Sequence, residues 1–564
     1  MLPCVDSPSH KITYTAKVKS DIPVLMSALA EGSIRATQSE PGDAYSKEEG
    51  VYRFRQPIGI PTYLIAIVGG TLEFRPLAPR VGVWAEPTMI DRAEWEFKHE
   101  ANRYLEAAEE TISPYSWTRY DCVVLPPSFP YGGMENANLT TLTPSLICGD
   151  RSQTDVLLHE LAHSWSGNLT SCANWSSFWL NEGINVWIER LLLQVVHGPE
   201  AGPSYRGFSY IIGAKALQDA LEQFESIKRF QRLVPIFKDG EDPDDAFSSI
   251  PYEKGSNFIL HLERTVGGLE IFLPFIQSHF KTFYDRSVTT EEWQQHLFDF
   301  YAGNAEITKK LKAVDWQGWL HGEGMKLPVK MEYDNTLAVE SQELADRWIK
   351  VVEGKRSAEE EKFGPNDIQG WDSNQVVVFL EGLHSGPKFT AANAELLDKT
   401  YDFSKQTNSE IRLRFYEVAL EDPKTAYKQE AAKWVSKQGR MKYCRVMYRA
   451  LNKVDPELAK ETFIKHRTFY HPIAAAMIAS VSALITVRGY GKRPACSHCC
   501  RLLLCRILVS HHDNLFSPLS FPLSFACISI QCRYPLQTTL LLRILDFHAV
   551  HRISDCHESA NRRP

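Results

Sequence analysis

The sequence lacks the features that mark nucleic acid binding, membrane insertion and secretion. The net charge is −7, so no basic excess favours a nucleic acid partner. The apolar stretch at 473–487 is shorter than the roughly 20 residues of a transmembrane helix. No early segment combines a basic start, an apolar run and a small-residue cleavage site. We therefore expect no nucleic acid and no membrane partner, and a cytoplasmic or nuclear location.

Cysteine is sparse over most of the chain. Only five of the twelve cysteines lie before residue 481, and they are widely spaced. Such usage suits a reducing compartment better than a disulfide-linked secreted protein. The 564 residues are 44% apolar and 23% charged, which is typical of a globular chain of about two to four domains. We expect a monomer.

The hydrophobic patterning changes along the chain and predicts an α+β multidomain fold. Residues 10–18 alternate apolar and polar side chains, and 59–75 read as two further strands. The pattern is mainly helical from about 90 to 325 and again from 340 to 475, with a polar connector between. The predicted units are a β-domain (1–75), a central, mainly helical domain (76–325), a linker (326–338), a helical domain (339–478) and a tail (479–564).

The tail differs in composition from the rest of the chain. Residues 481–564 contain seven of the twelve cysteines, ten basic residues and four acidic ones. We interpret this segment as a non-native, disordered tail, because no helix or strand period accompanies the cysteines. The alternative is a small zinc knuckle formed by "CSHCC" with His511 and His512.

The stretch "HELAHSWSGN" (159–168) is the strongest candidate for a functional site. On a helix, the side chains of His159 and His163 project from the same face one turn apart, and Glu160 is the residue that follows His159. Two neutral imidazoles with an adjacent carboxylate are the arrangement that hydrolytic zinc sites use. The pattern alone is weak, because a long chain can contain it by chance.

A third ligand is expected from a second element. Glu182, in "FWLNEGINVWIER", opens a strong helical segment and would project from its first turn. Two histidines and one glutamate leave the fourth position of zinc open, which is typical of a catalytic site. The alternative for Glu182 is a carboxylate that stabilises a helix N-terminus. Glu189, two turns later, either supports a ligand or faces solvent.

These motifs resemble those of the gluzincin aminopeptidases. The resemblance rests on "HELAH", an eighteen-residue gap and "NEG", and on "PYGGMENANLTTLTPSL" (130–146), which is similar to the Gly-x-Met-Glu-Asn exopeptidase motif. A finer match, over about 4–478, is to the branch that combines aminopeptidase and epoxide hydrolase activities. It is carried by "LPPSFPYGGMEN", "HSWSGNL", "FWLNEG", "DPDDAFSSIPYEKGSNFILHLE" and "KQGRMKY".

The resemblance implies a partial N-terminal β saddle domain, a thermolysin-like, mostly α catalytic domain and a C-terminal armadillo- or HEAT-like helical domain. It implies one zinc ion on His159, His163 and Glu182. Glu160 would act as general base, and Tyr252 would donate to the oxyanion of the intermediate. The residues implied to contact a peptide near its N-terminus are Gly132, Gly133, Met134, Glu135 and Asn136, with Glu135 binding the α-ammonium group.

The same resemblance implies two classes of substrate, short peptides and fatty-acid epoxides. Arg440 and Lys442 match a pair that holds a substrate carboxylate. Asp244 matches an acidic residue that assists epoxide opening. Phe247 departs from relatives that carry a tyrosine there, which puts the geometry of epoxide opening in question.

The resemblance begins inside the family's N-terminal β-domain, and a glutamine that contributes to the substrate amine site has no counterpart. A partial sheet would expose strand edges. The alternative to an active enzyme is therefore a catalytically impaired or inactive fragment or splice product. A thermolysin-like endopeptidase is disfavoured, because Glu135 and its neighbours would block extension beyond the substrate N-terminus.

Overall fold

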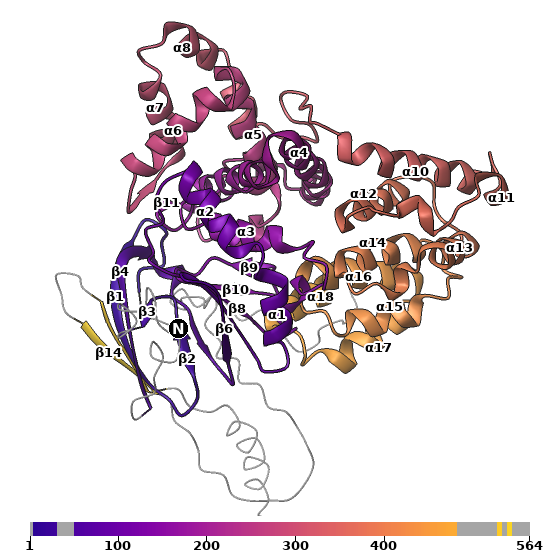
Figure 1. The fold of residues 1–564 in the computed structure, drawn as a ribbon, viewed down its shortest axis with the longest axis horizontal. Helices are drawn as coiled ribbons and strands as arrows, with labels where there is room; N and C mark the ends of the chain where they lie inside the picture. Colours follow the sequence, from indigo (N-terminus) through magenta and orange to yellow (C-terminus); the bar gives the residue numbers. More distant parts are fainter. Residues whose placement is uncertain (1–3, 31–49, 482–526, 533–537, 544–564) are drawn as a thin grey trace, which may run out of the picture.

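A computed structural model describes residues 4–30, 50–481, 527–532 and 538–543 (Figure 1). The first sheet has the order β14-β13-β1-β4-β3. Along β1 the side chains of Tyr14, Ala16 and Val18 are buried and those between them are exposed, as the alternating sequence predicts. Its strands are β1 (Lys11–Lys19), β3 (Leu29–Ala30), β4 (Val51–Pro61), β13 (Cys527–Cys532) and β14 (Thr538–Arg543), while β2 (Val24–Met26) pairs with β5 (Ile67–Gly69).

Two strands lie in the region that the sequence predicts to be a disordered tail. β13 pairs antiparallel with β1, and β14 with β13. The physical reason for this difference is the open edge of β1, whose backbone groups need partners that a distant segment can supply. Residues 479–481, also assigned to the tail, belong to α18 (Pro472–Val481), and the rest of the tail, including the proposed knuckle at "CSHCC", His511 and His512, lies outside the described residues.

A second sheet carries part of the site. Its order is β6-β7-β8-β10-β9, with β7, β8 and β10 parallel and β9 antiparallel at the edge. It lies mostly in the region expected to be mainly helical, where its short strands give little alternation. Its strands are β6 (Glu73–Ala78), β7 (Val81–Ala85), β8 (Tyr120–Val124), β9 (Gly133–Met134) and β10 (Leu139–Leu142).

Helices cover this second sheet and form most of the catalytic region (Figure 1). The longest, α4, is kinked at Gly198, whose φ of 77° is left-handed. The elements are α1 (Ile90–Phe97), α2 (Ala101–Thr111), α3 (Thr154–Ala162), α4 (Trp179–Gln223), α5 (Ile250–Val266), α6 (Leu269–Thr282), α7 (Thr290–Phe300), α8 (Ala305–Lys312) and α9 (Trp316–His321), with β11 (Thr170–Cys172) pairing with β12 (Arg286–Val288).

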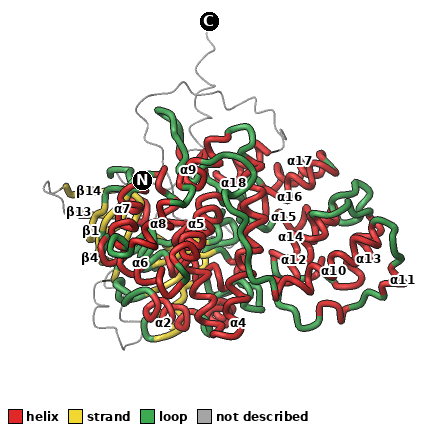
Figure 2. Tube along the Cα trace, turned by 90° about the horizontal axis from the view of Figure 1, so that it is seen from above, coloured by secondary structure: helices red, strands yellow, loops and turns green. Residues whose placement is uncertain are grey.

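The C-terminal helices have their own hydrophobic core, which extends from Leu344 to Ile478. Figure 2 shows them grouped to one side of the catalytic helices. Backbone bonds join the two parts, because the N–H groups of Gly439 and Met441 donate to the carbonyls of Pro127 and Pro130 at 2.9 and 2.8 Å. The helices are α10 (Thr336–Val352), α11 (Ala358–Glu361), α12 (Ser373–His384), α13 (Ala391–Tyr401), α14 (Ser409–Ala419), α15 (Lys428–Val435), α16 (Met441–Val454), α17 (Pro456–His466) and α18 (Pro472–Val481).

This architecture confirms the α+β fold class, with an N-terminal sheet, a catalytic region and a C-terminal helical domain. Among the described residues, none of the helices combines the length and the apolar character that crossing a bilayer requires.

The first sheet is tied to the loop that follows α3. The buried Lys11 ammonium on β1 donates to the carbonyl of Asn168 at 2.9 Å and to that of Leu169 at 2.5 Å. Burial lowers the pKa of Lys11 to about 7, although Asp285 favours the charged form. The N-terminal strands therefore support the catalytic region directly.

Helices α4 and α5 cross at two glycines. A Cβ on Gly183 would lie 2.7 Å from the Cα of Gly255, and a Cβ on Gly255 would lie 2.8 Å from the Cα of Gly183. Such contacts allow no side chain, so the backbones approach closely here. Glu182 lies next to this crossing on α4, and Tyr252 lies one turn before it on α5.

We predict that Gly183→Ala destabilises the protein by about 1–3 kcal/mol, because the new methyl group would press on backbone that cannot rotate away. Urea unfolding followed by tryptophan fluorescence measures the change. Gly303→Ala is the matched control, since a Cβ there meets nothing within 4 Å. Equal stability of the two variants would contradict the proposed tight crossing.

Candidate metal centre and neighbouring side chains

The motif helix α3 brings its two histidines together at its C-terminal end. His159 lies in the last turn, and His163 is the residue that caps the helix. The Asn185 amide on α4 donates to the carbonyl of His159 at 2.9 Å, which links the two helices beside the motif. The structure thus packs α3 against α4 beside the motif.

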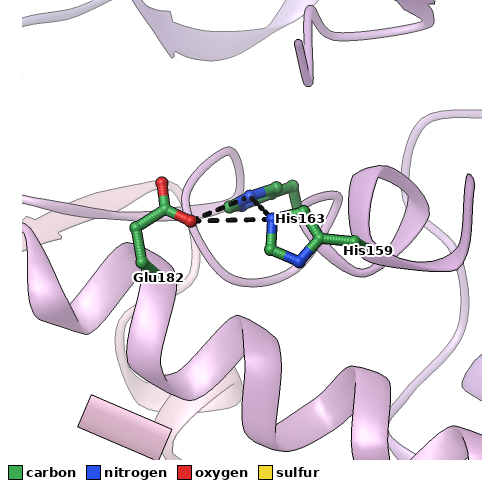
Figure 3. Close-up of side chains that lie close together, drawn as sticks. All are labelled: His159, His163 and Glu182. Carbon is green, nitrogen blue, oxygen red and sulfur yellow. Dashed lines mark hydrogen bonds and ion pairs between the residues drawn. The ribbon is translucent and has the colours of Figure 1, made fainter. Parts of the chain in front are cut away.

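Three nitrogen and oxygen atoms form a small triangle (Figure 3). His159 Nε2 and His163 Nε2 are 3.2 Å apart, and Glu182 Oε2 is 3.7 and 3.3 Å from them, respectively. Ligands at about 2.0–2.2 Å from a tetrahedral zinc ion are separated by roughly 3.4 Å. The triangle therefore has the dimensions of three corners of a zinc tetrahedron.

The hydrogen bonds of the imidazoles leave both Nε2 atoms free for a cation. His163 Nδ1 lies 2.7 Å from the carbonyl oxygen of Ser166, which can only accept, so Nδ1 carries the proton. His159 Nδ1 lies 2.9 Å from Glu189 Oε2, a carboxylate that fixes the same tautomer. Two lone pairs then face each other across the triangle, an arrangement that a bound cation stabilises. Glu189 therefore contacts His159 and does not face solvent.

The carboxylate of Glu182 also indicates a cation-binding site. Its Oε2 is buried and has no hydrogen-bond donor among the described residues. A buried anionic oxygen without a donor is costly unless a cation neutralises it. The position of Glu182 in the first turn of α4 aims this oxygen at the two histidines.

Two further carboxylates lie beside the triangle. Glu135 and Glu160 are 8% and 6% exposed, and their oxygens and His163 lie within 4.8 Å of one another. Burial raises the pKa of Glu160 well above its usual range, and the negative charges of Glu135 and Glu182 add to this against the attraction of His163. Gly133 on β9 is pressed against Glu160, so a side chain there would fill the space.

The segment that carries Glu135 is held rigidly. The Asn168 amide donates to the carbonyl of Glu135 at 2.7 Å. The Asn136 amide turns back to the Met134 carbonyl at 3.5 Å and to the Thr141 hydroxyl at 3.4 Å, so Asn136 stabilises the β9–β10 turn. Gly133 and Met134 form the edge strand β9, which leaves one side of their backbone unpaired within the sheet.

Tyr252 comes from the first turn of α5 and stacks on His159, with ring centroids 6.0 Å apart. Its hydroxyl has no hydrogen-bond partner among the described residues. Burial raises the pKa of Tyr252 well above its usual range, and the charges of Glu182, Glu135 and Glu160 raise it further. The hydroxyl therefore keeps its proton and can donate it in a hydrogen bond.

Arg440 and Lys442 come from the C-terminal helical domain. Arg440 precedes α16, and its Nη2 lies 2.6 Å from the position of a Cβ on Gly132. Lys442 Nζ donates to Glu410 at 2.7 Å. Arg440 thus lies against the strand segment that leads to Glu135.

Asp244 and Phe247 lie at a more exposed position, in and after the short helix η6 (Pro243–Ala246). Burial and the negative charge of Asp244 raise the pKa of Tyr131 to about 12. The Phe247 ring is 49% exposed and contacts Tyr252, with centroids 6.3 Å apart. Asp244 therefore lies near Tyr131, and Phe247 lies against Tyr252.

Tyr63 is a site residue that the sequence analysis did not find. It lies in the short helix η2 (Thr62–Leu64), and its hydroxyl accepts a hydrogen bond from Asn181 at 3.2 Å. Burial, with the nearby negative charges of Glu135 and Glu182, raises the pKa of Tyr63 well above its usual range. No local motif marks this tyrosine, because its neighbours come from elements distant in sequence.

Comparisons with known proteins match both the catalytic and the helical region. Residues 95–319 match the peptidase family M1 domain, and 371–481 match the C-terminal domain described as leukotriene A4 hydrolase. The chain is 42% identical over 480 residues to leucine aminopeptidase 2 of Emericella nidulans, covering 85% of this chain and 74% of that protein.

Two further relatives agree with this match. A leukotriene A-4 hydrolase homolog of Botryotinia fuckeliana is 40% identical, with 84% of this chain and 70% of that protein covered. The solved structure of yeast LTA4 hydrolase in complex with bestatin superposes with a TM-score of 0.78 at 37% identity, over 85% of this chain and 76% of that one. The chain therefore belongs to peptidase family M1, whose members are aminopeptidases that use a single zinc ion.

Proposed function

We propose that this protein is a zinc aminopeptidase that releases N-terminal residues from short peptides. The observation that carries the proposal is the position of Glu135 beside the His159–His163–Glu182 triangle, as a buried carboxylate with no hydrogen-bond donor in the described part of the chain. A carboxylate in this place favours substrates that bring a cation to the site, as the free α-ammonium of a peptide does. The complete ligand set, with Glu160 and Tyr252, disfavours the alternative of an inactive fragment.

The chemistry follows from the groups around the triangle. Zinc, held by His159, His163 and Glu182, would polarise the scissile carbonyl and acidify a water molecule. Glu160 takes the proton of the attacking water and passes it to the leaving amine, and its raised pKa suits a group that must also carry a proton. The protonated Tyr252 hydroxyl stabilises the oxyanion that develops on the carbonyl.

The edge strand β9 explains how a peptide would lie in the cleft. The unpaired side of Gly133 and Met134 can hydrogen-bond an extended backbone, as exposed sheet edges do in peptide recognition. Glu135 follows directly and would bind the α-ammonium, so the chain of the substrate ends there. This arrangement favours an exopeptidase over an endopeptidase.

The other end of a short peptide would meet Arg440 and Lys442. A guanidinium binds a carboxylate through two parallel hydrogen bonds, while an ammonium acts as a point charge. We also propose that fatty-acid epoxides such as leukotriene A4 use this carboxylate site, with Asp244 assisting epoxide opening. The match of the helical domain and the names of two relatives support this finer assignment, while Phe247 provides no hydroxyl beside Tyr252.

We predict that the purified protein contains about one zinc ion per chain and that Glu189→Ala lowers zinc affinity about 10- to 100-fold, because His159 loses the acceptor that orients it. Zinc competition with a fluorescent chelator measures the affinity. Glu306→Ala, on the surface of α8, is the control. Unchanged zinc affinity in Glu189→Ala would show that this contact does not support the metal.

Glu160→Gln is predicted to retain zinc and to lower kcat for alanyl-anilide about 10²- to 10⁴-fold, because the amide cannot accept the proton of the water. Tyr252→Phe is expected to retain zinc and to lose about 10²-fold in kcat through the missing hydrogen bond. Metal analysis accompanies the kinetics. Parent-like turnover in Glu160→Gln would exclude Glu160 as the base.

Arg440→Ala is predicted to raise KM about tenfold or more for tri-alanine and for a fatty-acid epoxide, and to leave the KM of the tri-alanine amide nearly unchanged. The amide carries no carboxylate, so it serves as the internal control. Equal effects on tri-alanine and its amide would remove Arg440 from substrate recognition. An inert epoxide with active peptide cleavage would restrict the function to the aminopeptidase.

A further inference from the structure

Glu410, in the first turn of α14, lies among the cations Lys442, Arg440 and Arg414. Its Oε1 accepts hydrogen bonds from Lys442 Nζ at 2.7 Å and from the Tyr443 hydroxyl at 2.9 Å. Arg440 Nη1 is 3.7 Å from the same oxygen. The other oxygen, Oε2, accepts from Arg414 at 2.9 Å. The Glu410 side chain is 5% exposed, so solvent screens these charges little.

The cations determine the charge state of this carboxylate. Burial alone would raise the pKa of Glu410, but Lys442, Arg414 and Arg440 outweigh burial and hold the pKa well below its usual range. Glu410 is therefore a permanent anion across the pH range in which peptidases are assayed. It is a resident carboxylate in the site that a substrate carboxylate is proposed to enter.

The two edges of the Arg440 guanidinium differ in their hydrogen bonding. Nη1 donates to the Tyr443 hydroxyl at 3.0 Å, and this hydroxyl in turn donates to Glu410. Nη2 and Nε face Gly132 and make no recorded hydrogen bond among the described residues. The Glu410–Tyr443 pair thus orients Arg440 so that its other edge, here called the open edge, lies beside Gly132 without a hydrogen-bond partner among the described residues.

We propose that Glu410 is a specificity-determining residue whose negative charge limits the affinity of Arg440 and Lys442 for the C-terminal carboxylate of a substrate. The proposal rests on the proposed role of Arg440. A substrate carboxylate at the open edge of Arg440 shares its cations with Glu410 and is repelled by it. The cleft therefore holds a free carboxylate more weakly than its cations alone would allow, which favours product release.

The test compares tri-alanine with its C-terminal amide in the zinc-loaded parent protein and in Glu410→Gln. Glutamine keeps the size of the side chain and an oxygen for Lys442 and Tyr443, and removes the charge. We expect Glu410→Gln to lower the KM for tri-alanine about five- to tenfold at low ionic strength and to leave the KM of the amide within about twofold. A higher KM for tri-alanine, or equal changes for both substrates, would overturn the proposal.

Glu381→Gln is the matched control. Glu381 binds Arg414 at 2.9 Å, and no direct contact with Arg440 or Lys442 is recorded for it. It removes the same charge at greater distance, so the ratio of the two KM values is expected to stay near that of the parent. A shift as large as that of Glu410→Gln would assign the effect to overall charge and contradict a specific role of Glu410.

A different result would show that the proposed role of Arg440 in substrate binding is wrong. If the parent protein and Arg440→Ala show the same ratio of KM values, Arg440 does not bind the carboxylate, and the proposed function fails first. If Glu410→Gln does not fold, the charge-balanced double variant Glu410→Gln/Arg414→Gln replaces it. This variant is expected to lower the KM for tri-alanine relative to its amide about twofold or more, and no shift would overturn the proposal.

Discussion

The close crossing of α4 and α5 determines the geometry on which the rest of the site depends. Gly183 and Gly255 allow the two backbones to touch. Each helix then places one side chain of the candidate site near this contact, Glu182 from α4 and Tyr252 from α5. A carboxylate and a phenol that come from separate helices keep a constant separation only if those helices cannot slide. The glycine contact provides that constraint without using any side chain.

Buried charge is compensated in two different ways within this cleft. In the metal centre, the anionic Glu182 oxygen has no donor in the described structure and depends on a cation from outside the chain. In the helical domain, Glu410 receives donors from Lys442 and Arg414 and is neutralised internally. The first arrangement creates binding capacity for a metal, and the second limits the attraction of the site for anions. The neutralisation of buried carboxylates therefore affects both the stability of the fold and the selection of ligands.

The metal-binding motif could be predicted from the sequence because its geometry is local. His159 and His163 share a helix, and the position of Glu182 at a helix start is visible in the pattern. Tyr63 and Glu410 could not be found in this way, since their partners lie far away in the chain and only packing brings them together. The pairing of β13 with β1 was missed for the same reason. The two strands are far apart in the sequence, and the side chains of β13 do not indicate which strand edge it will pair with.

The backbone bonds between Gly439 and Pro127 and between Met441 and Pro130 have a consequence for the evolution of peptide length preference. On the proposed function, one end of a peptide is held by the catalytic region and the other by the helical domain. The distance between the two ends of the bound peptide is then set by the contact between the catalytic region and the helical domain, and by neither domain alone. A small change in the loop before α16 could shift the preferred length while leaving every catalytic side chain untouched.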